Sequence, residues 1–360
     1  MMNSKLKFFF ILSFMAFFLS NCDKNDPPIE TTVEEDKENI KNLFNDVITE
    51  TKALKAGCAM QAIDDFLNLD RGQALNSNWA EMLYNTLESH LNITAYQTNK
   101  FNFTNHVGTH SWNASTQNWT ASSLPTDKIV LEMPAIMGAN SNSVVATAHH
   151  YTDQQVSYNN YQYWLPTSLM ANVSVNNEDC IGVDLKSATY DNTSFQIPVE
   201  MEMHLTLAPY VFEIKAKRTA PAKLNVEIIA KNNGTEKFSL VTDLTYDHAN
   251  YETLDYFNDC IAASGEFKFG DFTLPFTADF ETARSLFNPT NVQINTLFDA
   301  DVFYKGNEIA DLDYAKDYQG YADIHITYKD GTIEDTETYY DDFVDRLELV
   351  LVEFTGPWPN

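Results

Sequence analysis

The sequence has little basic charge and, beyond its N-terminal segment, no long apolar run. Only 23 residues are Lys or Arg against 51 that are Asp or Glu, which gives a formal net charge of -28 at pH 7. Such a chain repels the phosphates of nucleic acids and anionic lipid, so we expect no nucleic-acid partner. Cations, neutral glycans and basic partners are favoured, although acidity also keeps an exported protein soluble without any partner.

The N-terminus has the pattern of an export signal. Lys5 and Lys7 precede an apolar stretch over residues 8–19, which is too short to cross a bilayer of about 30 Å as a helix. The next four residues resemble the lipobox of bacterial lipoproteins: Leu19, Ser20, Asn21 and Cys22. The resemblance implies that residues 1–21 are removed and that Cys22 is acylated, whereas a plain signal peptide would end in an Ala-x-Ala-like site.

A short acidic segment follows the cysteine. Residues 23–28 (DKNDPP) look like the stretch that directs Bacteroidota-type lipoproteins to the outer cell surface. The resemblance implies a protein that is lipid-anchored to the outer membrane of the cell envelope and exposed at the surface. Prolines and charges predict a flexible tether over residues 22–35. Because no later segment has about eighteen consecutive apolar residues, we expect no membrane span after the anchor.

Cysteines are few. Once Cys22 is acylated, three remain, so at most one disulfide can form within the chain, and the pairing among Cys58, Cys180 and Cys260 stays open. Their wide spacing excludes a CxxC redox pair and every closely spaced zinc motif.

Helical periodicity dominates residues 36–100. Apolar residues recur at helical spacing over 40–48 and continue past Gly57 to 67. A second helix begins at an Asn78 cap, with Glu81 three residues on, and ends near residue 92. The pattern therefore predicts a pair of helices in this segment.

From residue 101 the apolar period changes to two, which predicts strands. Alternation is clearest over 199–207, and a hairpin is expected at Asn232-Asn233-Gly234. A composition shift near residue 250 divides the strands into a region over 101–249 and a second region over 250–360. The second region contains a turn at Lys329-Asp330-Gly331 and a closing helix over about 343–354.

Together these elements predict an α+β fold, in which an N-terminal helical pair packs on a large antiparallel sheet, with a half-barrel as one form of that sheet. The architecture resembles the half-barrels of lipoprotein carriers and of mycobacterial lipid-binding lipoproteins, although no motif of either family is present and fold alone does not give function. Five short segments are similar to uncharacterised Bacteroidota lipoproteins: Trp112-Asn113, Trp119, Lys128-Ile129-Val130, Pro134 and Leu165-Pro166. This similarity implies no activity.

One aromatic run has the composition of a ligand-binding surface. Over residues 158–164 aromatic rings alternate with amides, as on sugar-binding surfaces, and the candidate contacts are Tyr158, Tyr161, Tyr163 and Trp164. Trp112 and Trp119 flank a turn and could extend this platform. The alternative is that aromatics at strand edges, and a cross-strand tryptophan pair, serve packing alone.

The C-terminal third is acidic. Asp299 and Asp301, like Asp311 and Asp313, would point the same way from a strand, which is how oxygen ligands converge on calcium. No EF-hand loop is present, so a solvated acidic face is the alternative and calcium is the one candidate cofactor.

Evidence for an enzyme is weak. His106 and His110 would lie some 13 Å apart on a strand, and the adjacent His149 and His150 would face opposite ways, so neither pair suits a metal. The strand pair Glu200 and Glu202 lies beside His204 with a spacing loosely like that of glycosidases, yet it also fits a solvent-facing strand. No Gly-x-Ser-x-Gly elbow, HExxH motif or phosphate loop occurs.

Three hypotheses follow. The first is a non-enzymatic, membrane-tethered protein that binds a glycan or an apolar ligand. The second is a structural or adhesive surface protein that calcium stabilises, and the third is a hydrolase. A hollow between helices and sheet would favour an apolar ligand, a flat aromatic strip would favour a glycan, and a cleft with two buried carboxylates would favour the enzyme.

Overall fold

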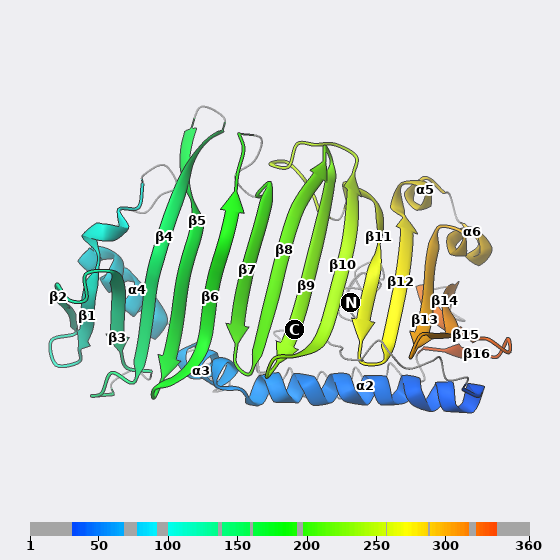
Figure 1. The fold of residues 1–360 in the computed structure, drawn as a ribbon, viewed down its shortest axis with the longest axis horizontal. Helices are drawn as coiled ribbons and strands as arrows, with labels where there is room; N and C mark the ends of the chain where they lie inside the picture. The colour runs from blue at the N-terminus through cyan, green and yellow to red at the C-terminus, as the bar shows by residue number, and fades with distance from the viewer. Residues whose placement is uncertain are drawn as a thin grey trace. The chain divides into compact units, whose positions relative to one another are not determined.

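A computed structural model describes residues 31–67, 78–91, 100–135, 139–158, 161–192, 197–256, 258–286, 289–316 and 322–336. Strands dominate and helices are few, so the α+β class is confirmed. Within these residues the sheet is open and contains 16 strands, which hydrogen-bond in the order β16-β15-β14-β13-β12-β11-β10-β9-β8-β7-β6-β5-β4-β3-β1-β2 (Figure 1). Cys22 and the expected closing helix lie outside the described residues.

The described residues form two compact units. The first unit consists of residues 31–52 and 217–336, and the second of residues 53–216. Helix α2 (Val33–Ala56) and strand β8 (Tyr210–Ala220) each contribute residues to both units. The boundary that we expect near residue 250 falls inside the first unit, between β10 and β11.

The first unit is a succession of antiparallel hairpins joined to α2 and two short helices. The expected turn between β9 and β10 is confirmed, and Asn233 and Gly234 have φ angles of 50° and 79°, as a tight two-residue hairpin turn requires. The elements are β9 (Lys223–Asn232), β10 (Thr235–Tyr246), β11 (Cys260–Phe269), β12 (Phe272–Asp279), α5 (Phe280–Ser285), α6 (Asn291–Asn295), β13 (Phe298–Tyr304), β14 (Asn307–Lys316), β15 (Ala322–Tyr328) and β16 (Ile333–Asp335).

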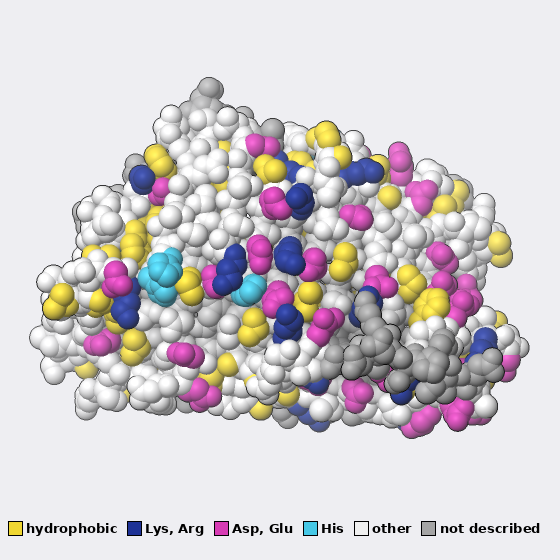
Figure 2. All heavy atoms as spheres, in the orientation of Figure 1, with side chains coloured by type: hydrophobic (Ala, Val, Ile, Leu, Met, Phe, Trp, Pro, Cys, Tyr) yellow, Lys and Arg dark blue, Asp and Glu magenta, His cyan; other side chains and the backbone are white. Residues whose placement is uncertain are grey.

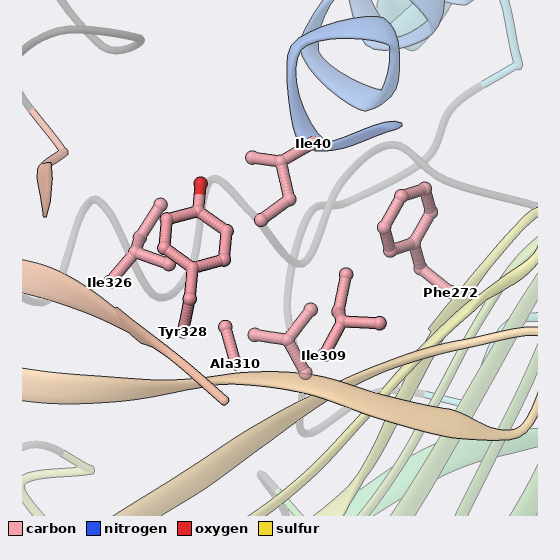
Figure 3. Close-up of a cluster of buried hydrophobic side chains, with 7 residues drawn as sticks. Ile40, Phe272, Ile309, Ala310, Ile326 and Tyr328 are labelled. Carbon is pink, nitrogen blue, oxygen red and sulfur yellow. The ribbon is translucent and has the colours of Figure 1, made fainter. Parts of the chain in front are cut away.

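Helix α2 covers the apolar face of this unit's sheet. Figure 3 shows Ile40 reaching from α2 toward Ile309, Ala310 and Tyr328 of the strands below it. Ile309 is fully buried and Tyr328 is 1% exposed. The helix begins with a capping box in which the Thr32 hydroxyl accepts from the amide of Glu35 (3.3 Å), while the Glu35 carboxylate accepts from the amide of Thr32 (2.7 Å).

The second unit contains the remaining strands and helices: α3 (Cys58–Leu67), α4 (Asn78–Leu91), the 3-10 turn η2 (Phe103–Asn105), β1 (Gly108–Asn113), β2 (Asn118–Ser122), β3 (Lys128–Met133), β4 (Val144–Tyr158), β5 (Tyr161–Val175), β6 (Glu178–Thr189) and β7 (Glu200–Leu207). Its sheet is mixed, which corrects the expectation of a purely antiparallel one. β1 pairs antiparallel with β2 and parallel with β3, because after the β1–β2 hairpin the chain returns to the other side of β1.

The described residues of the helical region form three helices where the periodicity predicts two. The first expected helix is interrupted at Gly57, where a Cβ atom would lie 2.0 Å from the carbonyl oxygen of Ala208, so only glycine fits this close approach. α4 begins at Asn78 and ends at Leu91, as expected. A disulfide joins Cys58 of α3 to Cys180 of β6 and settles the pairing, while Cys260 is free and buried.

Candidate functional site

The first unit carries a groove of about 700 Å³. Two cross-strand rows form its floor: Lys223, Thr245, Ala262 and Asp279 in one, and Asp243, Ser264 and Thr277 in the other. Thr277 and Phe272 lie on opposite faces of β12, and Phe272 packs in the cluster under α2. The groove therefore lies on the face that α2 leaves uncovered. Because neighbouring strands lie about 4.8 Å apart, a row across four strands spans roughly 14 Å.

The depth of the groove follows from side-chain size. Strand β11 places the small residues Ala262 and Ser264 on the floor, between the larger Thr245 and Thr277 of its neighbours. Thr296 and the adjoining Leu297 also line the groove. They directly follow helix α6, which begins with a capping box between Thr290 and Gln293.

Five of the 13 residues that line the groove carry hydroxyl groups, two carry carboxylates and one carries an ammonium, while the other five are Ala or Leu. Asp243 accepts a hydrogen bond from the side-chain amide of Asn225 (2.9 Å). Asp279 accepts from the amide (2.8 Å) and the hydroxyl (2.7 Å) of Thr282, which lowers the pKa of Asp279 and caps α5. Among the described lining residues there is no histidine or cysteine. The arrangement can donate and accept hydrogen bonds.

Trp112 and Trp119 are packing residues. They form the expected cross-strand pair, with ring centroids 5.6 Å apart, and each is only 5% exposed. Leu83 of α4 completes the cluster, and the indole nitrogen of Trp119 donates to the hydroxyl of Thr86 (3.2 Å). The structure thus favours the packing interpretation of this pair over an aromatic platform.

The aromatic run over 158–164 spans the β4–β5 hairpin. Tyr158 pairs with Tyr161 in the backbone register, and their side chains lie outside the described set. Tyr163 and Trp164 are half-buried on opposite faces of β5. Only one of these two rings can therefore belong to a given binding surface.

Asp299, Asp301, Asp311 and Asp313 lie on the same sheet face as the groove. Asp301 of β13 is paired with Asp311 of β14, while Asp313 accepts from Asn295 of α6 (3.0 Å) and from Thr327 (2.6 Å). Asp299 is paired with Thr277 of the groove. Burial, followed by repulsion from Asp301 and Glu308, raises the pKa of Asp311 to about 6. Figure 2 shows acidic side chains beside β12 and β13, whereas both signs are interspersed over β7 to β9.

Another cluster was not expected from the sequence. Side-chain atoms of Asp247, His248 and Asp259 lie within 4.8 Å of one another, in the loop between β10 and β11. His248 Nδ1 accepts from the amide of Asn250 (3.2 Å), so a neutral ring carries its proton on Nε2, which lies 3.2 Å from Asp259. A metal at Nε2 would require the opposite tautomer, with the proton on Nδ1. The cluster therefore acts as a hydrogen-bonded loop contact.

Three histidines of the second unit are closer together than strand spacing predicts, because His106 follows η2 and precedes β1. His110 Nε2 donates to the carbonyl oxygen of His106 (2.9 Å), so His110 Nδ1 accepts from His90 Nε2 (3.0 Å). Burial, with repulsion from His110 second, lowers the pKa values of His90 and His106.

His149 and His150 also depart from the expectation that they face opposite ways. Their rings are 4.4 Å apart. His150 has a φ of 55° within a bulge of β4, which turns its side chain out of the regular alternation. His204 lies 3.9 Å from Glu202 on β7, and both side chains are substantially exposed, as on a solvent-facing strand.

Comparison with protein families, curated proteins and solved structures finds no match to this chain. Within the described part of the chain, none of the helices combines the length and the apolar character needed to cross a bilayer.

Proposed function

We propose that the protein is a non-enzymatic binding protein whose groove holds a hydroxyl-rich ligand such as a glycan. The observation that carries the proposal is the lining of threonine and serine hydroxyls beside Asp243 and Lys223. These groups can replace the hydrogen bonds that sugar hydroxyls make with water. An apolar ligand would leave each covered polar group unsatisfied, at a cost of about 1–3 kcal/mol. Of the two ligand classes, the groove therefore favours the glycan over an apolar ligand held in a half-barrel.

We also propose that the chain is anchored through Cys22 at the outer membrane and displayed at the cell surface. The support is the lipobox-like Leu19–Cys22 sequence and the acidic segment after it. Two or more acyl chains would hold the protein firmly, whereas one binds only reversibly. Labelling cells with an alkynyl palmitate analogue tests the anchor. We expect label in the natural chain and none in Cys22→Ser, and external protease should remove the protein from intact cells. An unlabelled natural chain would contradict the anchor without affecting the groove.

A glycan array followed by calorimetry tests the groove. The chain from residue 31 onward should bind at least one glycan, and Ser264→Tyr, which fills the floor, should weaken binding at least tenfold. Asp243→Asn should weaken binding several-fold, since it removes a charge-assisted acceptor. Val241→Tyr is the matched control, because Val241 is 41% exposed on the same strand face and outside the lining. No binding on the array, or equal losses in Ser264→Tyr and Val241→Tyr, would refute the proposal.

A calcium-stabilised structural or adhesive protein is the second candidate, and one observation favours it. Asp301 and Asp311 are cross-strand partners, and their repulsion at neutral pH is the kind that a divalent cation relieves. Under this proposal, millimolar calcium at pH 7.5 raises the melting temperature of the natural chain and has no effect on Asp301→Asn/Asp311→Asn. An equal response of the two proteins would remove this candidate.

A further inference from the structure

Asp153 of β4 is a buried carboxylate that is only partly satisfied. Its side chain is 7% exposed, and Oδ1 lies 3.3 Å from the ammonium of Lys100. The other oxygen, Oδ2, is buried and has no hydrogen-bond partner among the described residues. Because a buried charge without full pairing is costly, such a group requires an explanation beyond the packing of the sheet.

The lysine that pairs with this carboxylate also contacts an aromatic ring, and further rings pack nearby on β4. The ammonium of Lys100 lies 4.5 Å from the centroid of the Trp164 ring, at the distance of a cation–π contact. Phe101 and Phe103 pack on Tyr151, two residues before Asp153, with centroid distances of 5.6 and 5.7 Å. Burial, then the Asp153 charge and then a side-chain hydrogen bond with Asp153 raise the pKa of Tyr151 to about 12, so its hydroxyl stays neutral and donates to that carboxylate.

We infer that Asp153 and Trp164 form a binding site for an organic ammonium ion, and that Lys100 is an internal occupant which such a ligand replaces. A carboxylate beside an aromatic face in a desolvated setting is an arrangement that recognises ammonium groups. Lys100 supplies the same chemistry as the ligand. An alkylammonium has three N–H donors, and one not tethered to the backbone can reach both Asp153 oxygens, including the unsatisfied Oδ2.

Lys100 and Asp153 differ in burial, as replacement of the Lys100 ammonium by a ligand requires. The Lys100 side chain is 54% exposed against 7% for Asp153, so the cation reaches the site from solvent and can leave it while the carboxylate stays in place. The net charge of -28 also raises the local concentration of cations. This site belongs to the second unit, whereas the groove belongs to the first, so neither depends on the other.

Titration of the chain from residue 31 onward with butylammonium and tetramethylammonium, followed by tryptophan fluorescence and calorimetry, tests the inference. Lys100→Ala, which empties the site, should bind butylammonium at least tenfold more tightly than the natural chain. Asp153→Asn added to Lys100→Ala should abolish that gain. Lys41→Ala, which removes an exposed lysine of α2, is the control and should behave like the natural chain.

The two probes separate the sources of the ligand. Tighter binding of butylammonium indicates hydrogen bonding to Oδ2, as a lysine side chain or another primary amine would make. Equal binding of tetramethylammonium indicates recognition by ring and charge, as a quaternary headgroup would require. A Lys100→Ala protein that melts like the natural chain and binds neither ion overturns the inference.

If Lys100→Ala does not fold, Lys100→Gln is used in its place. This variant should also bind butylammonium more tightly than the natural chain. If that variant also fails to fold, acylation of Lys100 in the natural chain is measured with and without tetramethylammonium. We expect the ion to expose Lys100 and accelerate its acylation relative to Lys41, and an unchanged ratio overturns the inference.

Discussion

The two units hold their helices to the sheet in different ways. In the first unit, α2 packs aliphatic and aromatic residues against β12 to β15, and Lys37 pairs with Glu334 at 2.9 Å. In the second unit, α3 is bonded covalently to β6 through Cys58 and Cys180, and α4 contacts the sheet through Trp112, Trp119 and a histidine chain. One continuous pattern of alternating strands is thus stabilised by apolar burial at one place and by a covalent cross-link at another.

Acid acts in opposite directions on Asp311 of the first unit and on two histidines of the second. In the first unit, the raised pKa of Asp311 means that the folded chain binds more protons than the unfolded chain between about pH 4 and 6. The favourable contribution of Asp311 to the free energy of unfolding is present at low pH and is lost as the pH rises through about 6. In the second unit, the lowered pKa values of His90 and His106 mean that the unfolded chain binds more protons, so stability is lost as the pH falls below the ordinary histidine pKa of 6.5.

The largest expected effect is loss of the disulfide. Reduction, or the pair Cys58→Ser/Cys180→Ser, should lower the free energy of unfolding of the second unit by about 2–5 kcal/mol, because the cross-link closes a long loop in the unfolded chain. Native-state hydrogen exchange should show faster exchange in β4 to β7 than in β11 to β15. Cys260→Ser, which leaves the disulfide intact, is the control. Equal acceleration in both units would refute the distinction between them.

A cavity in the first unit should give an effect of about 2–5 kcal/mol. Ile309 is fully buried in the cluster beneath α2, so Ile309→Ala removes buried apolar area and leaves a void. Ile333→Ala deletes the same atoms from a side chain that is 60% exposed and should change the free energy of unfolding by less than about 0.5 kcal/mol. Denaturant unfolding of the two variants measures the difference, and similar losses would contradict the packing described for α2.

Relief of the carboxylate pair should stabilise the first unit. Asp311→Asn keeps the shape and removes the charge, so we expect a gain of about 1 kcal/mol at pH 7.5, after allowance for partial solvent exposure. The gain should vanish at pH 4, where Asp311 of the natural chain is already protonated. Asp330→Asn is the contrasting control, because the backbone amide of Thr332 stabilises that carboxylate and lowers its pKa. A gain that does not change with pH would contradict the assignment.

The smallest expected effect concerns the histidine chain. Lowering the pH from 7.5 to 5 should destabilise the second unit, because burial, with repulsion from His110 second, lowers the pKa values of His90 and His106. His110→Asn should reduce this pH dependence while lowering stability at pH 7.5, because the His110 ring hydrogen-bonds to His90 and to the carbonyl oxygen of His106. Hydrogen exchange in β1 to β3 at the two pH values measures the change. Identical pH slopes in the variant and the natural chain would exclude the histidines as its source.

Local chemistry made several features predictable. The Asn-Gly turn between β9 and β10 requires positive φ angles, and α4 begins at Asn78, a residue type that is common where helices start. The groove could not be predicted, because its lining comes from segments separated by up to about eighty residues and contains no motif. The Asp153–Trp164 site could not be predicted for a related reason. The pattern of aromatic residues indicates Trp164 alone, whereas Lys100 lies before β1 and Asp153 lies in a bulged strand.

Periodicity, backbone conformation and a count of thiols predict from the sequence the class of fold, its clearest turns and a limit of one disulfide among Cys58, Cys180 and Cys260. The tertiary structure decided that Cys58 pairs with Cys180, that Gly57 interrupts a helix against Ala208, and that Trp112 and Trp119 are buried. Each of these features depends on contacts between segments that are distant in the sequence. Strand pairing and burial determine those contacts, and no local sequence pattern predicts them.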